Sequence, residues 1–144
     1  MSAVDDVFDF LEYNGIANGS TGWTLVRRRM LETPAEDQLV MVSEDGGGGP
    51  EIPAEAGTLG DAAMYDIGVL VIVRAARWDG DASATKAQEI FDALHGQRFV
   101  TVGSTEYLRV RARTPEPIFV GFDDNGKPRH TISFMLLRDA VVSA

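Results

Sequence analysis

The sequence predicts a single α+β domain over residues 1–144, with two amphipathic helices packed on one face of a largely antiparallel, mixed sheet. Apolar runs with strand character outnumber the helical segments and do not alternate strictly with them, which favours this class over an α/β fold. A length of 144 residues supports one hydrophobic core. A Gly/Pro-rich stretch at 44–61 predicts a long flexible loop within the domain.

The first predicted element is a helix from about residue 3 to residue 13, because its apolar residues recur at the i, i+3, i+4, i+7 spacing of one helix face. Ser2 and Asp5 resemble a capping box at its start, and Asn14-Gly15 supplies its end. The apolar face consists of Val4, Val7, Phe8 and Leu11.

Strands are predicted next at 23–30 and 38–43, with Thr33-Pro34 in the turn between them. The loop at 44–61 follows the second strand, and its glycines and prolines favour a mobile segment over packed structure.

Residues 65–74 predict the central strand of the sheet. Both of its alternating faces are apolar, so both need a cover, from helices or from a neighbouring subunit. A second helix is predicted at about 83–95, with Asp81 or Ser83 as its N-cap and Gly96 just beyond its end.

Two hairpins complete the predicted fold. The first joins 99–102 to 107–113, and the second joins 118–122 to 129–137. Asn125-Gly126 lies between the last two runs, and both residue types tolerate positive φ, which makes this a strong hairpin signal.

Composition limits the classes of partner. The chain has 13 basic and 22 acidic residues and a formal net charge of −9, so its average field repels nucleic acid and anionic membranes. It has no cysteine, which excludes disulfides and thiolate metal sites. The N-terminus lacks the pattern of a secretory signal and the apolar run at 67–73 is too short for a membrane span, so a cytoplasmic site of synthesis is expected.

No residue pattern predicts catalysis or a bound cofactor. His95 and His130 have no Ser or Cys motif beside them, so both are interpreted as structural. Residues 123–125 lack the twelfth-position Glu of a calcium loop and are interpreted as turn residues. The glycines at 46–49 precede no Lys-Ser or Lys-Thr and are interpreted as a linker. The sequence therefore predicts a protein that is not an enzyme and holds no cofactor or metal.

Two arginine clusters are the charged candidates for an interface. In a strand, the second cluster places three guanidinium groups on one face and its apolar neighbours on the other. With a net charge of −9, contact with carboxylates, within the subunit or across a subunit boundary, competes with a solvated sheet face and with nucleic-acid contact. The clusters are Arg27, Arg28 and Arg29, and then Arg109, Arg111 and Arg113.

Four segments, taken together, resemble a known family. They are the N-terminal amphipathic helix, V-L-V-I-V-R at Val69–Arg74, F-D-A-L-H-G at Phe91–Gly96, and G-F-D-D-N-G-K-P-R-H-T-I-S-F at Gly121–Phe134. This combination resembles the tail terminator proteins of long-tailed bacteriophages, also called tail completion or minor capsid proteins. The motifs concern packing and turns, so the resemblance carries over no catalytic residue.

The resemblance implies a virion structural protein, of a phage or of a related gene transfer agent. Such proteins form a homohexameric ring that caps the tail tube, stops its polymerisation and presents a surface to the head–tail connector in the neck. The implied partners are further copies of the chain, the tail tube protein and the connector, while DNA passes through the ring without specific binding. The implied location is the virion, after assembly in the host cytoplasm.

The family resemblance gives the 44–61 loop a role as a contact arm. In this interpretation its apolar residues, Ile52 and Leu59, would anchor on a neighbouring subunit and order the loop only in the assembly; the alternative interpretation is a plain disordered insertion. Two other functions stay open for the whole chain: a head-closure or neck connector protein, and a small cytoplasmic enzyme or ligand-binding domain, which would need a pocket with convergent polar groups.

Overall fold

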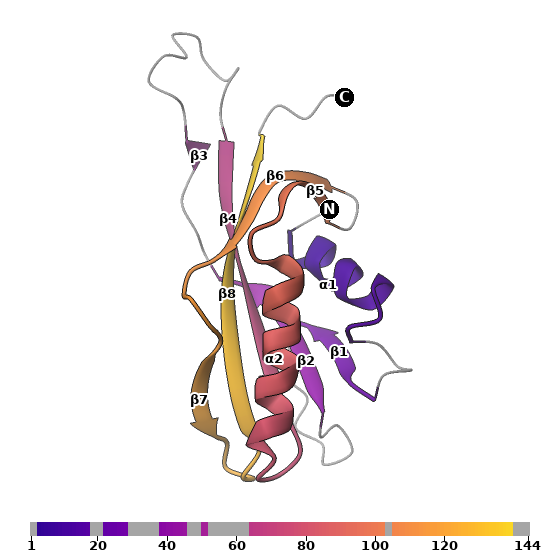
Figure 1. Cartoon of the computed structure of the whole chain (residues 1–144), viewed down its shortest axis with the longest axis vertical. Helices are drawn as coiled ribbons and strands as arrows, with labels where there is room; N and C mark the ends of the chain where they lie inside the picture. Colours follow the sequence, from indigo (N-terminus) through magenta and orange to yellow (C-terminus); the bar gives the residue numbers. More distant parts are fainter. Residues whose placement is uncertain are drawn as a thin grey trace, which may run out of the picture.

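The computed structural model describes residues 3–17, 22–28, 38–45, 50–51, 64–102 and 105–139, which form two helices and one curled, mixed sheet (Figure 1). This is the predicted α+β class. The elements in chain order are α1 (Ala3–Tyr13), β1 (Thr24–Arg27), β2 (Leu39–Glu44), β3 (Pro50–Glu51), β4 (Met64–Arg74), α2 (Gly80–Leu94), β5 (Arg98–Val102), β6 (Thr105–Ala112), β7 (Ile118–Phe122) and β8 (Pro128–Asp139).

The sheet has the strand order β1-β2-β4-β8-β6-β5. β1 and β2 pair in parallel and the other described pairs are antiparallel. β4 and β8 pair along their lengths, from Met64 opposite Asp139 to Arg74 opposite Arg129. The other edge of β8 is shared: β6 pairs with residues 134–137 and β7 with residues 128–131. The two hairpins therefore lie at opposite ends of one long strand (Figure 1).

The hydrophobic core lies between the helices and one face of the sheet. Each strand turns alternate residues to that face, and fully burying a Val or Leu side chain contributes ~1.5–3 kcal/mol. Leu70 and Ile72 of β4 point to the other face and are half-buried. The helices thus cover one of the two apolar faces predicted for the central strand. The core positions include Val4, Val7, Leu11, Val42, Val69, Val71, Val73, Ile90, Leu94, Ile132, Phe134 and Leu136.

The ribbon of β5 and β6 twists as it leaves the sheet. Tyr107 and Val110 are both buried although they are three residues apart, a spacing that places them on opposite faces of a flat strand. The end of the ribbon turns toward α1, and there the hydroxyl of Tyr107 donates to Asp6 Oδ2 at 2.6 Å.

The start of α2 differs from the prediction. Asp79 is the N-cap, because its side chain accepts a hydrogen bond from the backbone N–H of Ala82 at 3.2 Å. The assignment of Asp81 or Ser83 as the cap was therefore wrong. Ser83 lies one turn inside the helix and is fully buried. Gly96 ends the helix with a φ of 84°, as predicted.

The turn between β7 and β8 is longer than a two-residue Asn-Gly turn. Gly126 has a φ of 76°, whereas Asn125 stays outside the left-handed region. Asp123 holds the turn instead, since its Oδ1 accepts from the backbone N–H groups of Asn125 and Lys127, both at 2.9 Å. Burial by itself raises the pKa of Asp123, but these two bonds, together with the nearby charges of Arg74 and Arg129, outweigh it and lower the pKa.

Part of the predicted 44–61 loop is ordered as sheet. Glu44 ends β2, and Pro50–Glu51 form β3 against Met64 and Tyr65. Asp45 is also described, whereas residues 46–49 and 52–61 of that loop lie outside the described residues, as do Ser2, Thr33-Pro34 and the end of the strand predicted at 23–30.

Candidate interaction surfaces

One end of the molecule exposes large apolar side chains. All of them belong to β7 except Trp78, which lies in the connection between β4 and α2, and each is 45–64 % exposed. We call this surface the aromatic end; it consists of Trp78, Ile118, Phe119, Val120 and Phe122. β7 pairs with the start of β8, at the opposite end of that strand from the β5–β6 ribbon (Figure 1).

The aromatic rings of this surface contact one another. The Phe122 ring lies 5.1 Å from the Trp78 ring and 5.5 Å from the Phe119 ring, measured between centroids. Phe119 also packs 5.2 Å from His130 of β8. These spacings are those of favourable tilted and edge-to-face pairs.

The backbone fixes Trp78 in an unusual conformation. Its φ is 64°, which is a strained value for a bulky residue. The Trp78 N–H donates to the carbonyl of Gly126 at 2.9 Å, so the β7–β8 turn holds the strained residue in place. Gly126 is required for this contact, since a Cβ there would lie 2.9 Å from Cζ2 of the Trp78 ring. Strain held in place by its surroundings is often found at functional positions.

An edge strand with exposed apolar side chains on both faces is a site for association. Soluble proteins normally protect such edges with charge, proline or short length, because an open edge pairs with other chains. β7 has no charged residue and no proline between Ile118 and Phe122, although its register with β8 shifts between Phe119 and Gly121. The run is visible in the sequence, but only the fold shows that it lies at an edge and that Trp78 joins it.

The described arginines of the first cluster contact carboxylates of their own subunit. Arg27 pairs with Asp5 at 2.8 Å and lies over the Phe8 ring, while the Nε–H of Arg28 is shared between the two carboxylate oxygens of Glu44. The bond from Arg28 lowers the pKa of Glu44, although both side chains are exposed and such pairs add little stability. Arg29 lies outside the described residues, with Ile52 and Leu59.

The second arginine cluster alternates as predicted along β6. Val110 and Ala112 are buried, and Arg109 and Arg111 are exposed. Arg113 turns back onto the subunit, where it lies 3.7 Å from Asp45 and donates to Met135 Sδ at 2.8 Å. The carboxylate of Asp45 also accepts from the Ser133 hydroxyl. Contact with carboxylates within the subunit thus holds for Arg27, Arg28 and Arg113.

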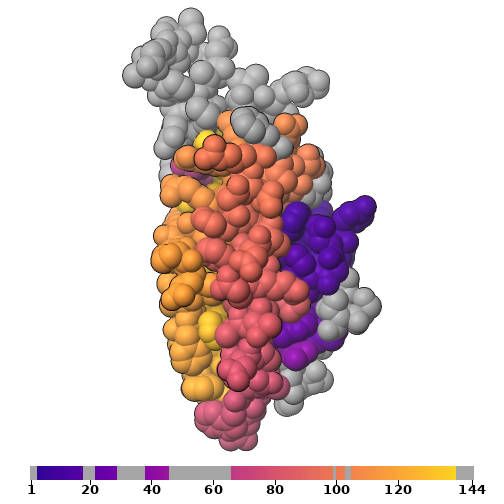
Figure 2. Space-filling view, viewed as in Figure 1, coloured from indigo at the N-terminus to yellow at the C-terminus, as the bar shows by residue number. Residues whose placement is uncertain are grey.

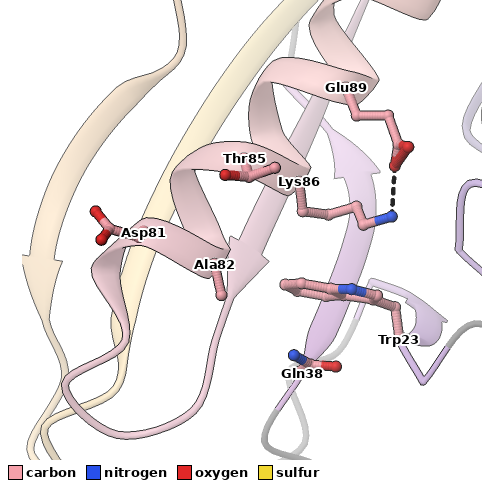
Figure 3. A pocket seen from close by; sticks show the side chains of 7 residues that line it. All are labelled: Trp23, Gln38, Asp81, Ala82, Thr85, Lys86 and Glu89. Atoms are coloured by element: carbon pink, nitrogen blue, oxygen red, sulfur yellow. Dashed lines mark hydrogen bonds and ion pairs between the residues drawn. The ribbon is translucent and has the colours of Figure 1, made fainter.

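A pocket of about 420 Å³ lies beside α2, where Trp23 and Gln38 approach the helix (Figure 3). The Lys86 side chain extends over the Trp23 ring, with its Nζ 5.4 Å from the ring centroid. That amine already donates to the carbonyl of Ile16 at 2.7 Å and to Glu89 at 2.5 Å. The lining thus offers an indole, hydrogen-bonding groups and two carboxylates, a set that suits a small cationic or polar ligand. Its residues are Trp23, Gln38, Asp81, Ala82, Thr85, Lys86 and Glu89.

Both histidines have structural partners. His130 Nδ1 lies 2.6 Å from the Ser83 hydroxyl, which itself donates to the carbonyl of Gly80 at 3.1 Å. Ser83 is fully buried in this pair and offers no surface to a substrate. His95 stacks on Phe91 and its Nδ1 accepts from the backbone N–H of Ala112 at 2.8 Å. No local pattern predicts the Ser83–His130 contact, because the fold joins two distant positions.

Within the described parts of the chain, no three His, Cys, Asp or Glu residues lie close enough together to hold a metal ion. None of the helices described here has the length and apolar character needed to cross a bilayer.

Comparison with known proteins gives information on the fold alone. No family model matches the sequence, and no curated protein is significantly similar to it. Among solved structures, 14 chains match. One of these, whose name is only a serial designation, aligns with a TM-score of 0.55 and 17 % identity, over 92 % of each chain. At that identity the likeness extends to the chain's architecture and not to its activity.

Proposed function

We propose that this chain is a ring-forming tail terminator, a structural protein that caps the tail tube of a phage-like particle and joins it to the head connector. The proposal begins from the family resemblance of the segments 69–74, 91–96 and 121–134. The structural observation that carries it is the aromatic end. A strained, exposed tryptophan and an apolar edge strand are features of a subunit that buries this surface in an assembly.

The two ends of the molecule also differ in chemistry, which supports the proposal. The aromatic end exposes apolar side chains, whereas the β5–β6 ribbon exposes Arg98 and Arg109. The ribbon lies at the other end of the molecule (Figure 1). A terminator contacts a tail tube on one side and a connector on the other, so it needs two unlike surfaces. A subunit of a closed ring also needs a complementary pair of lateral surfaces.

The test is deletion of the gene from the genome of its particle, followed by electron microscopy of the lysate. Tails of uncontrolled length without filled heads are the expected result. Normal-length free tails beside empty heads would assign the protein to the head side of the neck instead. Infectious particles of normal shape would overturn a structural role in the particle.

Complementation of the deletion tests the aromatic end directly. A Phe119→Ser/Phe122→Ser variant is expected to fold and to fail in restoring tail length, since its assembly surface is lost. Tyr13→Ser is the matched control, because Tyr13 is 91 % exposed at the end of α1 and belongs to no such surface. If both variants restored tail length, the aromatic end would not be an assembly surface.

The pocket beside α2 favours one other function, a small ligand-binding domain. Thermal denaturation in the presence of cationic and polar metabolites tests it. A ligand that raises the melting temperature of the wild type and not that of a Glu89→Gln/Asp81→Asn variant would establish binding at this site.

A further inference from the structure

The layers of the molecule carry opposite charge. α1 and α2 together contain seven carboxylates and one lysine, a formal charge of −6. β5, β6 and β8 together contain five arginines and two carboxylates, a formal charge of +3. The two helices lie next to each other on one side of the molecule (Figure 2). Although the whole chain has a net charge of −9, negative charge is concentrated in the helical layer and positive charge in this part of the sheet.

The positive charge is concentrated in an arginine stripe, defined here as Arg98, Arg109 and Arg111. All three are exposed, and Arg98 and Arg109 are directly opposite each other on β5 and β6. Like charges in that position destabilise a strand pair. Among the described residues no ion pair reaches the stripe, whereas Arg27, Arg28 and Arg113 each have a carboxylate within their own subunit. The stripe is thus suited to carboxylates from outside the subunit.

The negative charge of α2 lies on its outer side. Asp81, Glu89 and Asp92 are exposed, while the inner side of the helix contacts β8, β4 and β6. Gln88 donates to Asp92 and Lys86 to Glu89, and these bonds leave lone pairs on both carboxylates for further donors. We call these three residues the acidic helix surface.

We propose that the arginine stripe of one copy docks on the acidic helix surface of the next copy. Arginine suits this role, because its planar guanidinium group binds carboxylates through two parallel hydrogen bonds. The two surfaces belong to different parts of the subunit, so the contact is heterologous and each copy offers both halves of it. Closure of successive contacts into a ring rests on the proposed function, whereas the contact itself is a property of the purified chain.

Site-specific cross-linking tests the contact, and the lack of native cysteine makes the test clean. One variant carries Arg111→Cys in the stripe and the other carries Thr85→Cys, an exposed neutral position on α2. The two are mixed and treated with a short bis-maleimide. The mixed product is expected to be well above the about twofold excess over each same-residue product that random pairing of equal amounts gives, because a heterologous contact brings unlike positions together. A mixed product at or below that random excess would overturn the proposal.

Charge exchange then tests the chemistry of the contact. Adding Arg98→Glu and Arg109→Glu to the stripe variant is expected to lower the mixed product about tenfold. Adding Asp81→Arg and Asp92→Arg to the helix variant is expected to restore it. Tyr13→Glu is the control, since it adds negative charge at a 91 % exposed position outside both surfaces. A loss that charge exchange does not restore would contradict the proposal.

Two further measurements distinguish this contact from a nucleic-acid site and from the terminator role. If Arg98→Glu/Arg109→Glu left the cross-linking unchanged but abolished retention of a DNA duplex in a gel shift, the stripe would be a nucleic-acid site. That result would overturn the proposal. If charge exchange restored the cross-link but deletion of the gene left infectious particles intact, the contact would be confirmed and the terminator role overturned. Failed charge exchange in a protein whose deletion yields overlong tails would overturn the contact alone.

Discussion

At the scale of single residues, Gly126 permits the close approach between the β7–β8 turn and Trp78. A Cβ at this position would lie 2.9 Å from the Trp78 ring, and the φ of 76° is itself unfavourable for any other residue. We therefore expect Gly126→Ala to lower the free energy of unfolding by about 1–3 kcal/mol, measured by urea denaturation.

The matched control for this prediction is Gly15→Ala. Gly15 has a similar φ of 69°, and nothing lies within 4 Å of a Cβ built there. This variant carries the left-handed strain without the clash, so it should lose less stability than Gly126→Ala. Equal losses would mean that Trp78 moves freely and that the turn does not hold it.

His130 makes stability depend on pH in a defined direction. Burial lowers the pKa of His130, so the unfolded chain binds this proton more readily than the folded chain does. The neutral His130 ring therefore contributes fully to folding stability above the ordinary histidine pKa of about 6.5. This contribution is lost as the pH falls toward the lowered pKa of the folded state.

Melting temperatures measured from about pH 8 down to about pH 5 test this expectation. The wild type should lose more stability than His130→Gln over the acidic part of the range, because the variant has no proton to gain there. A wild type and His130→Gln variant with parallel profiles would contradict the assignment.

At the scale of elements, a buried hydrogen bond joins α1 to the β5–β6 ribbon. Tyr107 and Asp6 are both fully buried, and the burial of Tyr107, together with its bond to Asp6, raises the pKa of the hydroxyl well above its ordinary value. The hydroxyl is therefore a permanent donor. Tyr107→Phe should lower the free energy of unfolding by about 1–3 kcal/mol in urea, because it takes this donor from a buried carboxylate.

Tyr13→Phe serves as the comparison for that measurement, since Tyr13 is 91 % exposed. Its unfolding free energy should equal that of the wild type. If Tyr107→Phe were equally neutral, the ribbon would not depend on α1 for its position.

The elements that the sequence predicts well are those specified by local pattern. α1, the central strand β4 and the two hairpins follow from periodicity and turn residues that act over a few positions. β3 and the parallel pairing of β1 with β2 were not predicted, because they depend on which strands meet in the sheet. The N-cap was misassigned to Asp81 or Ser83 since several suitable residues stand within one turn, and geometry alone selects Asp79.

The candidate surfaces also differ in whether local sequence pattern predicts them. The alternation of arginines on β6 was predictable, because a strand turns every second residue to the same face. The aromatic end was not, since it joins Trp78 to a strand that follows much later in the chain.

At the scale of the whole molecule, the aromatic end should dominate the binding of apolar probes. We expect the fluorescence of anilinonaphthalene sulfonate bound to the native protein to fall strongly in Phe119→Ser/Phe122→Ser, because both rings are nearly half exposed. Tyr13→Ser should leave it unchanged. Equal fluorescence from all three proteins would place the main apolar surface elsewhere.

The two tryptophans give the molecule an intrinsic optical reporter of assembly. Trp23 is 8 % exposed beneath Lys86, whereas Trp78 is 64 % exposed at the aromatic end. Iodide in solution should therefore quench the emission of Trp78 and spare that of Trp23. When a partner covers the aromatic end, the quenchable fraction should disappear and the emission maximum should move to shorter wavelength. Assembly can thus be followed in the unlabelled protein, with the buried indole as its internal standard.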